Sequence, residues 1–164
     1  MTGIQFTRRG GFTVDAPPAQ AFPLFTPEEE VHWADGWTFR RIFPAGDQPA
    51  EGVLFSTSDV RGREMIWRIQ ALEPPRKVEY FNVTAGSHTT EITIELAPAR
   101  DGKTAVSVEY RYTPFTEEGA EFLRPMTNEA YREWMKTWEA EIRHYLATGT
   151  TLRHAQRRAG EAVK

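Results

Sequence analysis

Alternating apolar and polar residues predict β-strands through most of the first two thirds of the chain. The clearest signal is a hairpin around Asp101 and Gly102, a dipeptide typical of tight turns. Each strand of this hairpin presents one apolar face, made by Ile92, Ile94 and Leu96 before the turn and by Val106, Val108, Tyr110 and Tyr112 after it. Similar patterns predict five further strands, over residues 4–15, 37–44, 53–57, 65–71 and 77–84.

Two short helices are predicted between the first strand and the second. Residues 19–25 have the pattern of the first helix, and the second begins at Thr26. Pro27 suits the first helical position, and Glu29 is placed to complete a capping box with Thr26. In the strand that precedes these helices, Gly10 and Gly11 predict a β-bulge.

One long helix is predicted over residues 116–149. Thr116 is its expected N-cap and Gly149 its expected end, while Pro125 should kink or divide it into a short piece and a longer one. Its apolar face carries bulky side chains, namely Leu123, Tyr131, Trp134, Trp138 and Tyr145. Such a stripe is typical of a core-facing helix, and its size also suits the wall of a ligand chamber.

This element order predicts an α+β fold in which the helices cover one face of an antiparallel sheet. The chain has 164 residues, enough for one domain with a genuine core. We expect the domain to span residues 1–149, followed by a basic tail over residues 150–164.

The composition excludes several classes of function. A net charge of −3 argues against a broad nucleic-acid interface, and the absence of cysteine excludes disulfides and thiolate chemistry. The four histidines show no ligand spacing, so no metal and no cofactor are expected. No stretch approaches the roughly 20 apolar residues of a membrane span, so we expect no integral membrane segment and a cytoplasmic location. The sequence leaves a homodimer open.

Residues at both ends of the domain carry a resemblance to a known superfamily. They are Phe12, Val14, Ala16, Pro17, Ala21, Phe22 and Phe25, then Trp33 through Trp37, and finally Trp138, Glu139, His144, Tyr145, Leu146, Thr148 and Gly149. Over about residues 4–149 the chain resembles the START-like superfamily, also called SRPBCC. The resemblance implies a helix-grip fold, in which a seven-stranded antiparallel sheet wraps around the long C-terminal helix and encloses an apolar cavity. This superfamily hosts many unrelated functions, so the resemblance does not fix an activity.

Strand parity and the helical stripe predict the lining of that cavity. The expected ligand-binding residues are Trp33, Trp67, Tyr80, Thr90, Tyr110, Tyr112, Tyr131 and Trp134. Because tryptophan and tyrosine combine an apolar ring with a polar group, this lining suits a planar or amphipathic ligand.

Four polar residues have two interpretations each. His88 and Asn82 share the inward parity of their strands and are the candidates for proton transfer, but either could instead be an exposed residue at a strand end. Glu141 lies inside the apolar stripe, where it would pair with an arginine from the sheet or reach the edge. His32 could lie at the cavity mouth or on the surface.

The leading functional hypothesis is a carrier for a small hydrophobic molecule, aromatic or polyketide-like. The ligand would enter between the second helix and the sheet and rest against Tyr131 and Trp134. One alternative is a polyketide cyclase/dehydratase-like enzyme, which requires at least two titratable side chains converging in the cavity. Another is a protein-interaction module like the chaperone-activator branch, which predicts a filled cavity and an exposed apolar patch.

Overall fold

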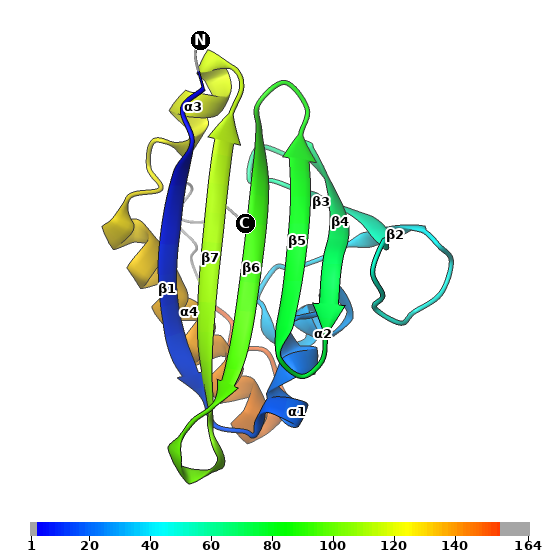
Figure 1. The fold of residues 1–164 in the computed structure, drawn as a ribbon, viewed down its shortest axis with the longest axis vertical. Helices are drawn as coiled ribbons and strands as arrows, with labels where there is room; N and C mark the ends of the chain where they lie inside the picture. Colours follow the sequence, from blue (N-terminus) through cyan, green and yellow to red (C-terminus); the bar gives the residue numbers. More distant parts are fainter. Residues whose placement is uncertain (1–2, 155–164) are drawn as a thin grey trace.

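The computed structural model describes residues 3–154 and contains one curved antiparallel sheet with the helices on its concave side (Figure 1). The strands are β1 Phe6–Val14, β2 Arg40–Phe43, β3 Leu54–Ser58, β4 Glu64–Glu73, β5 Lys77–Thr84, β6 His88–Pro98 and β7 Thr104–Pro114. Their order in the sheet is β1-β7-β6-β5-β4-β3-β2, so the first strand pairs with the last and the others follow as hairpins. The predicted seven-stranded α+β architecture is confirmed.

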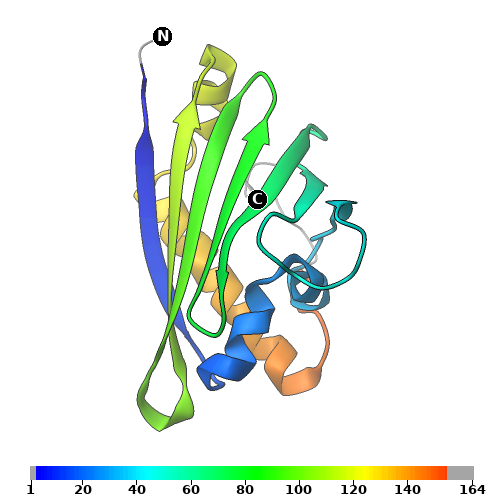
Figure 2. The same ribbon diagram turned by 45° about the vertical axis from the view of Figure 1, so that its right-hand side comes forward.

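The helical segments between and after the strands also match the predicted order. They are α1 Pro18–Ala21, the 3₁₀ turn η1 Phe22–Phe25, α2 Pro27–Trp33, the 3₁₀ turn η2 Arg100–Gly102, α3 Glu117–Leu123 and α4 Asn128–Thr148. Figure 2 shows α4 crossing the sheet on the same side as α1 and α2. Helix α3 lies at the C-terminal end of β7, at the opposite end of the sheet from α1. Within residues 3–154, no helix is long and apolar enough to cross a membrane.

The long C-terminal helix is divided near Pro125, as predicted. The side-chain oxygen of Thr116 accepts a hydrogen bond from the Gly119 amide, 3.0 Å away, and caps α3. A second cap forms at Thr127, whose hydroxyl accepts from the Ala130 amide at 3.1 Å and starts α4. Gly149 ends α4 with a φ of 69°, a conformation that glycine adopts without strain.

The predicted bulge at Gly10 and Gly11 is wrong. The pairing of β1 with β7 runs without interruption from Phe6 opposite Tyr112 to Val14 opposite Thr104. The glycines are needed for close packing instead, because a Cβ on Gly10 would lie 3.0 Å from the Met135 side chain of α4. A Cβ on Gly11 would overlap the carbonyl oxygen of Val106. Gly10 therefore lets α4 lie against β1, and Gly11 lets β1 lie close to the backbone of β7.

The predicted capping box at the start of α2 is also wrong. The Thr26 hydroxyl caps no amide of α2 and donates instead to the Pro23 carbonyl, 2.8 Å away in η1. The hydroxyl is engaged by the preceding turn, because η1 ends directly where α2 begins. The three glutamates of the first turn, Glu28 to Glu30, still favour this helix end electrostatically.

The core is rich in aromatic side chains that alternate inward along the strands. In β6 and β7 the residues predicted to face inward are buried, including Ile92, Ile94, Tyr110 and Tyr112. The turn between these strands uses the predicted dipeptide, with φ of 59° at Asp101 and 69° at Gly102. This hairpin supplies part of the concave face on which the candidate site lies.

Candidate functional site

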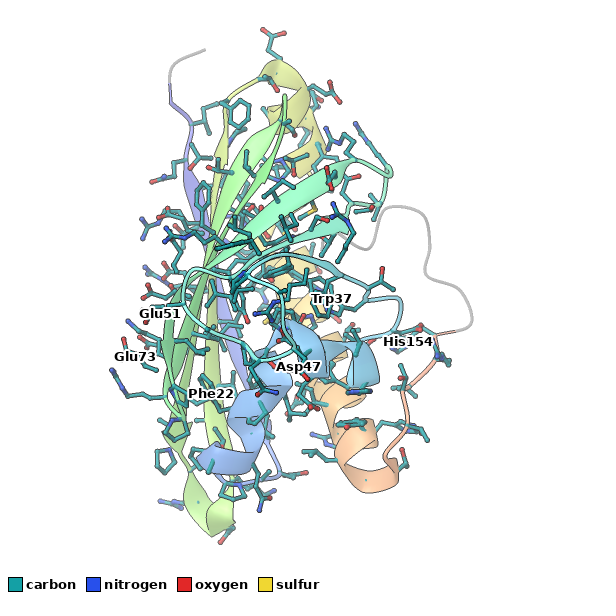
Figure 3. The ribbon with its side chains drawn as sticks, turned by 90° about the vertical axis from the view of Figure 1, so that its right-hand side faces the viewer. Phe22, Trp37, Asp47, Glu51, Glu73 and His154 are labelled. Carbon is teal, nitrogen blue, oxygen red and sulfur yellow. The ribbon has the colours of Figure 1, made fainter. Side chains whose placement is uncertain are left out.

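Among the described residues, two small pockets lie between the concave face of the sheet and the helices. The first, here called the α2 pocket, has a volume of about 20 Å³ and is lined by Pro27, Glu30, Trp37, Phe55, Trp67, Tyr80, Ile92, Ile94, Tyr110 and Trp138. The second, here called the α3 pocket, has a volume of about 10 Å³ and is lined by Met65, Trp67, Asn82, His88, Thr90, Tyr110, Tyr112 and Phe122. Figure 3 shows Trp37 on the α2 side of this interior.

Trp67 and Tyr110 line both pockets and separate them. Trp67 stacks on Phe55, with ring centroids 5.5 Å apart and an interplanar angle of 13°. Its indole Nε1 donates to Thr57 Oγ1 at 2.9 Å, which fixes the ring orientation. Tyr110 packs edge-on against Trp134, with centroids 5.0 Å apart. The chamber implied by the resemblance is therefore divided and largely filled by its own aromatic side chains.

The α3 pocket contains most of the polar residues expected on the concave face. His88, Asn82 and Thr90 are only 2%, 1% and 3% exposed, so all three side chains point inward as their parity predicts. The alternatives of an exposed histidine and a strand-end asparagine are excluded. Asn82 and Thr90 are directly opposite each other in β5 and β6, and Thr90 is directly opposite Tyr112 in β7. These three residues form one row across the sheet.

Two polar atoms of this row lack a hydrogen-bond partner among the residues that the structure describes. They are Asn82 Oδ1 and the Tyr112 hydroxyl, and both are buried. Two other buried tyrosines, Tyr80 on β5 and Tyr131 on α4, donate to backbone carbonyls. Tyr80 donates to the Phe25 carbonyl at 2.7 Å, and Tyr131 donates to the Val108 carbonyl at 2.8 Å. The row thus holds unused hydrogen-bonding capacity inside an otherwise apolar core.

His88 is held in place by two neighbours. Its Nδ1 lies 2.8 Å from Ser87 Oγ, and its ring stacks on Phe122 with centroids 5.6 Å apart. Burial lowers the pKa of His88 to about 4, and the positive charge of Arg63 acts in the same direction. Burial also raises the pKa of Tyr112 well above its usual value. Both side chains are therefore uncharged at neutral pH.

Helix α3 closes the α3 pocket with Phe122. Gly119 brings the helix against the Ser87 backbone, where any Cβ would overlap the carbonyl oxygen. Glu118 of α3 pairs at 3.2 Å with Arg63, which lies in the turn between β3 and β4. The same guanidinium lies 4.5 Å from the centre of the Phe122 ring and pairs with Asp59 at 2.8 Å. Phe122 was not among the residues predicted for the site, because its inward position depends on how α3 docks.

Three predicted lining residues lie outside the borders of these two pockets. Trp33 is fully buried, and its indole donates to the Leu24 carbonyl at 2.7 Å. Tyr131 and Trp134 pack against Tyr110, with centroids 5.9 Å and 5.0 Å away. They support a pocket residue from the α4 side.

Glu141 and His32 both contact the segment that follows α4, which runs back beside α2 to His154 (Figure 3). Glu141 is fully buried, and its carboxylate lies 3.4 Å from Nε2 of His154 in that segment. His154 is thus one partner of this buried carboxylate, and it comes from the segment after α4. His32 is exposed and stacks on Tyr145, with centroids 6.5 Å apart. In the part of the chain that the structure describes, no three potential ligands are grouped to hold a metal ion.

Comparisons with known proteins agree with this architecture. A family described as "Polyketide cyclase / dehydrase and lipid transport" matches residues 5–143. A search of curated proteins finds no match. Among solved structures, norcoclaurine synthase from Thalictrum flavum, in complex with dopamine and hydroxybenzaldehyde, is 12% identical with a TM-score of 0.64 and covers 89% of this chain and 88% of its own. The Mll3558 protein from Rhizobium loti is 20% identical with a TM-score of 0.58, covering 86% of this chain and 99% of its own. These likenesses establish the fold.

Proposed function

Because the chain belongs to the polyketide cyclase / dehydrase and lipid transport family, we propose that it binds a small hydrophobic molecule, aromatic or polyketide-like, between the sheet and its helices. The observation that carries this proposal is the pair of pockets that share Trp67 and Tyr110. A planar ligand between these two rings would extend into both pockets. Their lining combines aromatic rings with a few polar groups, which is the usual composition of a small-molecule site.

The ligand enters beside α2 in this proposal. Pro27, Glu30 and Trp37 form the α2 side of the first pocket, and the sheet forms the other. Tyr131 and Trp134 contribute through Tyr110, because a ligand that displaces the Tyr110 ring would rest on both of them.

The side chains must move before an aromatic molecule fits. A volume of about 20 Å³ is near the space that one water molecule needs. Ligand rings would therefore replace edge-to-face contacts among the lining aromatics, such as that of Trp67 with Tyr80, whose centroids are 6.1 Å apart. Because the protein must first reach such an open conformation, the apparent affinity is the intrinsic affinity multiplied by the fraction of molecules that are open.

Nuclear magnetic resonance with 2-naphthol as the probe tests the proposal. The indole N–H signal of Trp67 should shift with saturating dependence on probe concentration. The signal of Trp33, which is buried but lines neither pocket, is the internal control. If no indole signal responds to 2-naphthol or to other apolar probes, the binding function is rejected. Native mass spectrometry of the freshly purified protein would then identify any ligand that it carries naturally.

A cyclase/dehydratase-like enzyme is the second candidate. His88 and Tyr112 both line the α3 pocket, so two titratable groups converge as that hypothesis requires. A histidine with a pKa of about 4 is a weak base at neutral pH, so it would act as a neutral hydrogen-bond donor. Deuterium uptake at the central carbon of 1-phenyl-1,3-butanedione should then be faster with wild-type protein than with His88→Phe. Equal rates would reject the enzyme hypothesis and leave ligand binding as the proposed function.

A further inference from the structure

We infer that the α3 pocket recognises one neutral hydroxyl group of the ligand, a phenol or an enol, through Asn82 and Tyr112. This inference rests on the proposed binding function and adds the polar group that the site selects. Its basis is the row of side chains at the closed end of the chamber, where two buried polar atoms have no partner among the described residues.

The row places three polar side chains side by side across neighbouring strands. Asn82, Thr90 and Tyr112 occupy directly opposed positions in three neighbouring strands. Opposed side chains on one face of an antiparallel pair start about 4.5–5.5 Å apart. A single oxygen atom lying over Thr90 is therefore within reach of the longer side chains on either side of it.

The chemistry of the two atoms defines the group that satisfies both. Asn82 Oδ1 can only accept a hydrogen bond, so the ligand must offer a donor. The Tyr112 hydroxyl can donate, so the same ligand atom must also be able to accept. A hydroxyl group does both at once. An ether or a ketone has no donor for Asn82, and a plain hydrocarbon has neither function.

The size of the α3 pocket matches one such group. Its volume of about 10 Å³ has room for a single hydroxyl and not for a ring. The aromatic body of the ligand would accordingly lie between Trp67 and Tyr110 and extend toward the α2 pocket, which these two residues also line.

The electrostatics of the pocket favour a neutral group. None of its eight lining residues is an acid, a lysine or an arginine, and His88 is uncharged at neutral pH. Arg63 pairs with Asp59 and Glu118 and lies against the Phe122 ring. Arg8, whose charge acts on Tyr112, donates to the Met126 carbonyl at 2.7 Å. A carboxylate or an ammonium group placed beside Asn82 would be buried without a counter-ion, which is strongly unfavourable.

The test measures dissociation constants at pH 7 for four probes that share one ring system: naphthalene, 2-naphthol, 2-methoxynaphthalene and 2-naphthoate. Wild-type protein should bind 2-naphthol about tenfold more tightly than naphthalene, the gain expected from well-formed buried hydrogen bonds. Neither 2-methoxynaphthalene nor 2-naphthoate should share that gain. Tighter binding of either than of 2-naphthol would overturn the inference.

Two variants and one control assign the preference to its residues. Tyr112→Phe and Asn82→Leu should each reduce the naphthol-to-naphthalene ratio to below about threefold. Thr84→Val is the matched control, because Thr84 is also buried on β5 with an unpartnered hydroxyl among the described residues but lines neither pocket. Its ratio should equal that of wild type. Unchanged ratios in both Tyr112→Phe and Asn82→Leu would overturn the inference.

The outcomes separate this inference from the proposed function. Naphthalene binding without any preference for naphthol removes the hydroxyl site and leaves the binding function standing, whereas no binding of any probe removes both. Tyr112→Phe also keeps the test usable if Asn82→Leu fails to fold. It removes only an unpartnered oxygen, so its unfolding temperature should be equal to or above that of wild type.

Discussion

At the scale of single residues, the candidate site depends on polar side chains that are buried in an uncharged form. His88 is the clearest case, because its pKa of about 4 lies well below the value of 6.5 for a solvated imidazole. Burial is the main cause, and the Arg63 charge adds to it. The imidazole must therefore stay neutral for the native state to remain stable.

This predicts an acid-dependent loss of stability. Since the folded-state pKa of His88 is lower than the unfolded one, the unfolded chain binds more protons between about pH 6.5 and pH 4. The free energy of unfolding should fall through that window, by up to about 3 kcal/mol from this residue.

Urea unfolding of wild type and His88→Gln at pH 7 and pH 4.5 measures this loss. The variant should lose less stability between the two pH values, because glutamine does not titrate. All other titrating groups are present in both proteins and cancel in the comparison. An equal loss in the two proteins would contradict a neutral buried His88.

At the scale of elements, helix α3 decides whether the α3 pocket is closed. Its position depends on Gly119, which contacts the Ser87 backbone without space for a Cβ. The ion pairs of Glu118 with Arg61 and Arg63 lie at the surface, where such pairs contribute little. Steric fit is thus the main determinant of closure.

We predict that Gly119→Ala displaces α3 and destabilises the protein by about 1–3 kcal/mol, the usual range for overpacking. Binding of an apolar fluorophore such as 1-anilinonaphthalene-8-sulfonate should increase, because Phe122 no longer covers the pocket. Glu118→Gln is the control on the same helix, and its stability should change by less than about 1 kcal/mol. Equal effects of the two substitutions would show that charge, and not fit, holds α3.

The elements also show how far the sequence predicts this molecule. Strand parity gives His88, Asn82 and Thr90 an inward face, because a period of two follows directly from strand geometry. It leaves open an exposed histidine and a strand-end asparagine, and burial decides between these alternatives. Gly10 was misinterpreted because the reason for a glycine there, the side chain of Met135, is 125 positions away in the chain. Phe122 could not be assigned to the site, since its surroundings depend on the docking of α3. The degree to which aromatic rings fill the chamber likewise depends on side-chain packing that no local pattern encodes.

At the scale of the whole molecule, the exposed large apolar residues argue for a site in the interior. They are distributed over several elements, namely Ile4, Val31, Ile42, Phe43, Val60, Phe115 and Leu146. An interaction module would be expected to gather such residues into one patch. The filled chamber fits the interaction-module hypothesis. The buried Asn82 Oδ1 and Tyr112 hydroxyl, which have no hydrogen-bond partner among the described residues, instead favour a ligand inside the chamber.

The whole fold also has a connection between the segment after α4 and the end of α2, beside the α2 pocket. Thr151 donates to the His32 carbonyl at 2.7 Å, and Arg153 pairs with Asp35 at 2.9 Å. The backbone amide of His154 donates to the same Asp35 carboxylate at 3.1 Å. The segment after α4 therefore restrains the end of α2, whose other residues border the proposed route of the ligand.

We predict that Asp35→Ala loosens α2 and leaves the sheet intact. Hydrogen exchange of the amides of residues 30–34 should become severalfold faster, because the helix end loses the contacts to Arg153 and His154. Glu95→Ala is the control, since Glu95 lies exposed on the outer face of β6. Faster exchange in α2 should be accompanied by faster association of 2-naphthol, because the proposed route passes beside this helix. If exchange in α2 increases while the association rate stays constant, the ligand reaches the chamber by another route, and the α3 end, closed by Phe122, becomes the path to test.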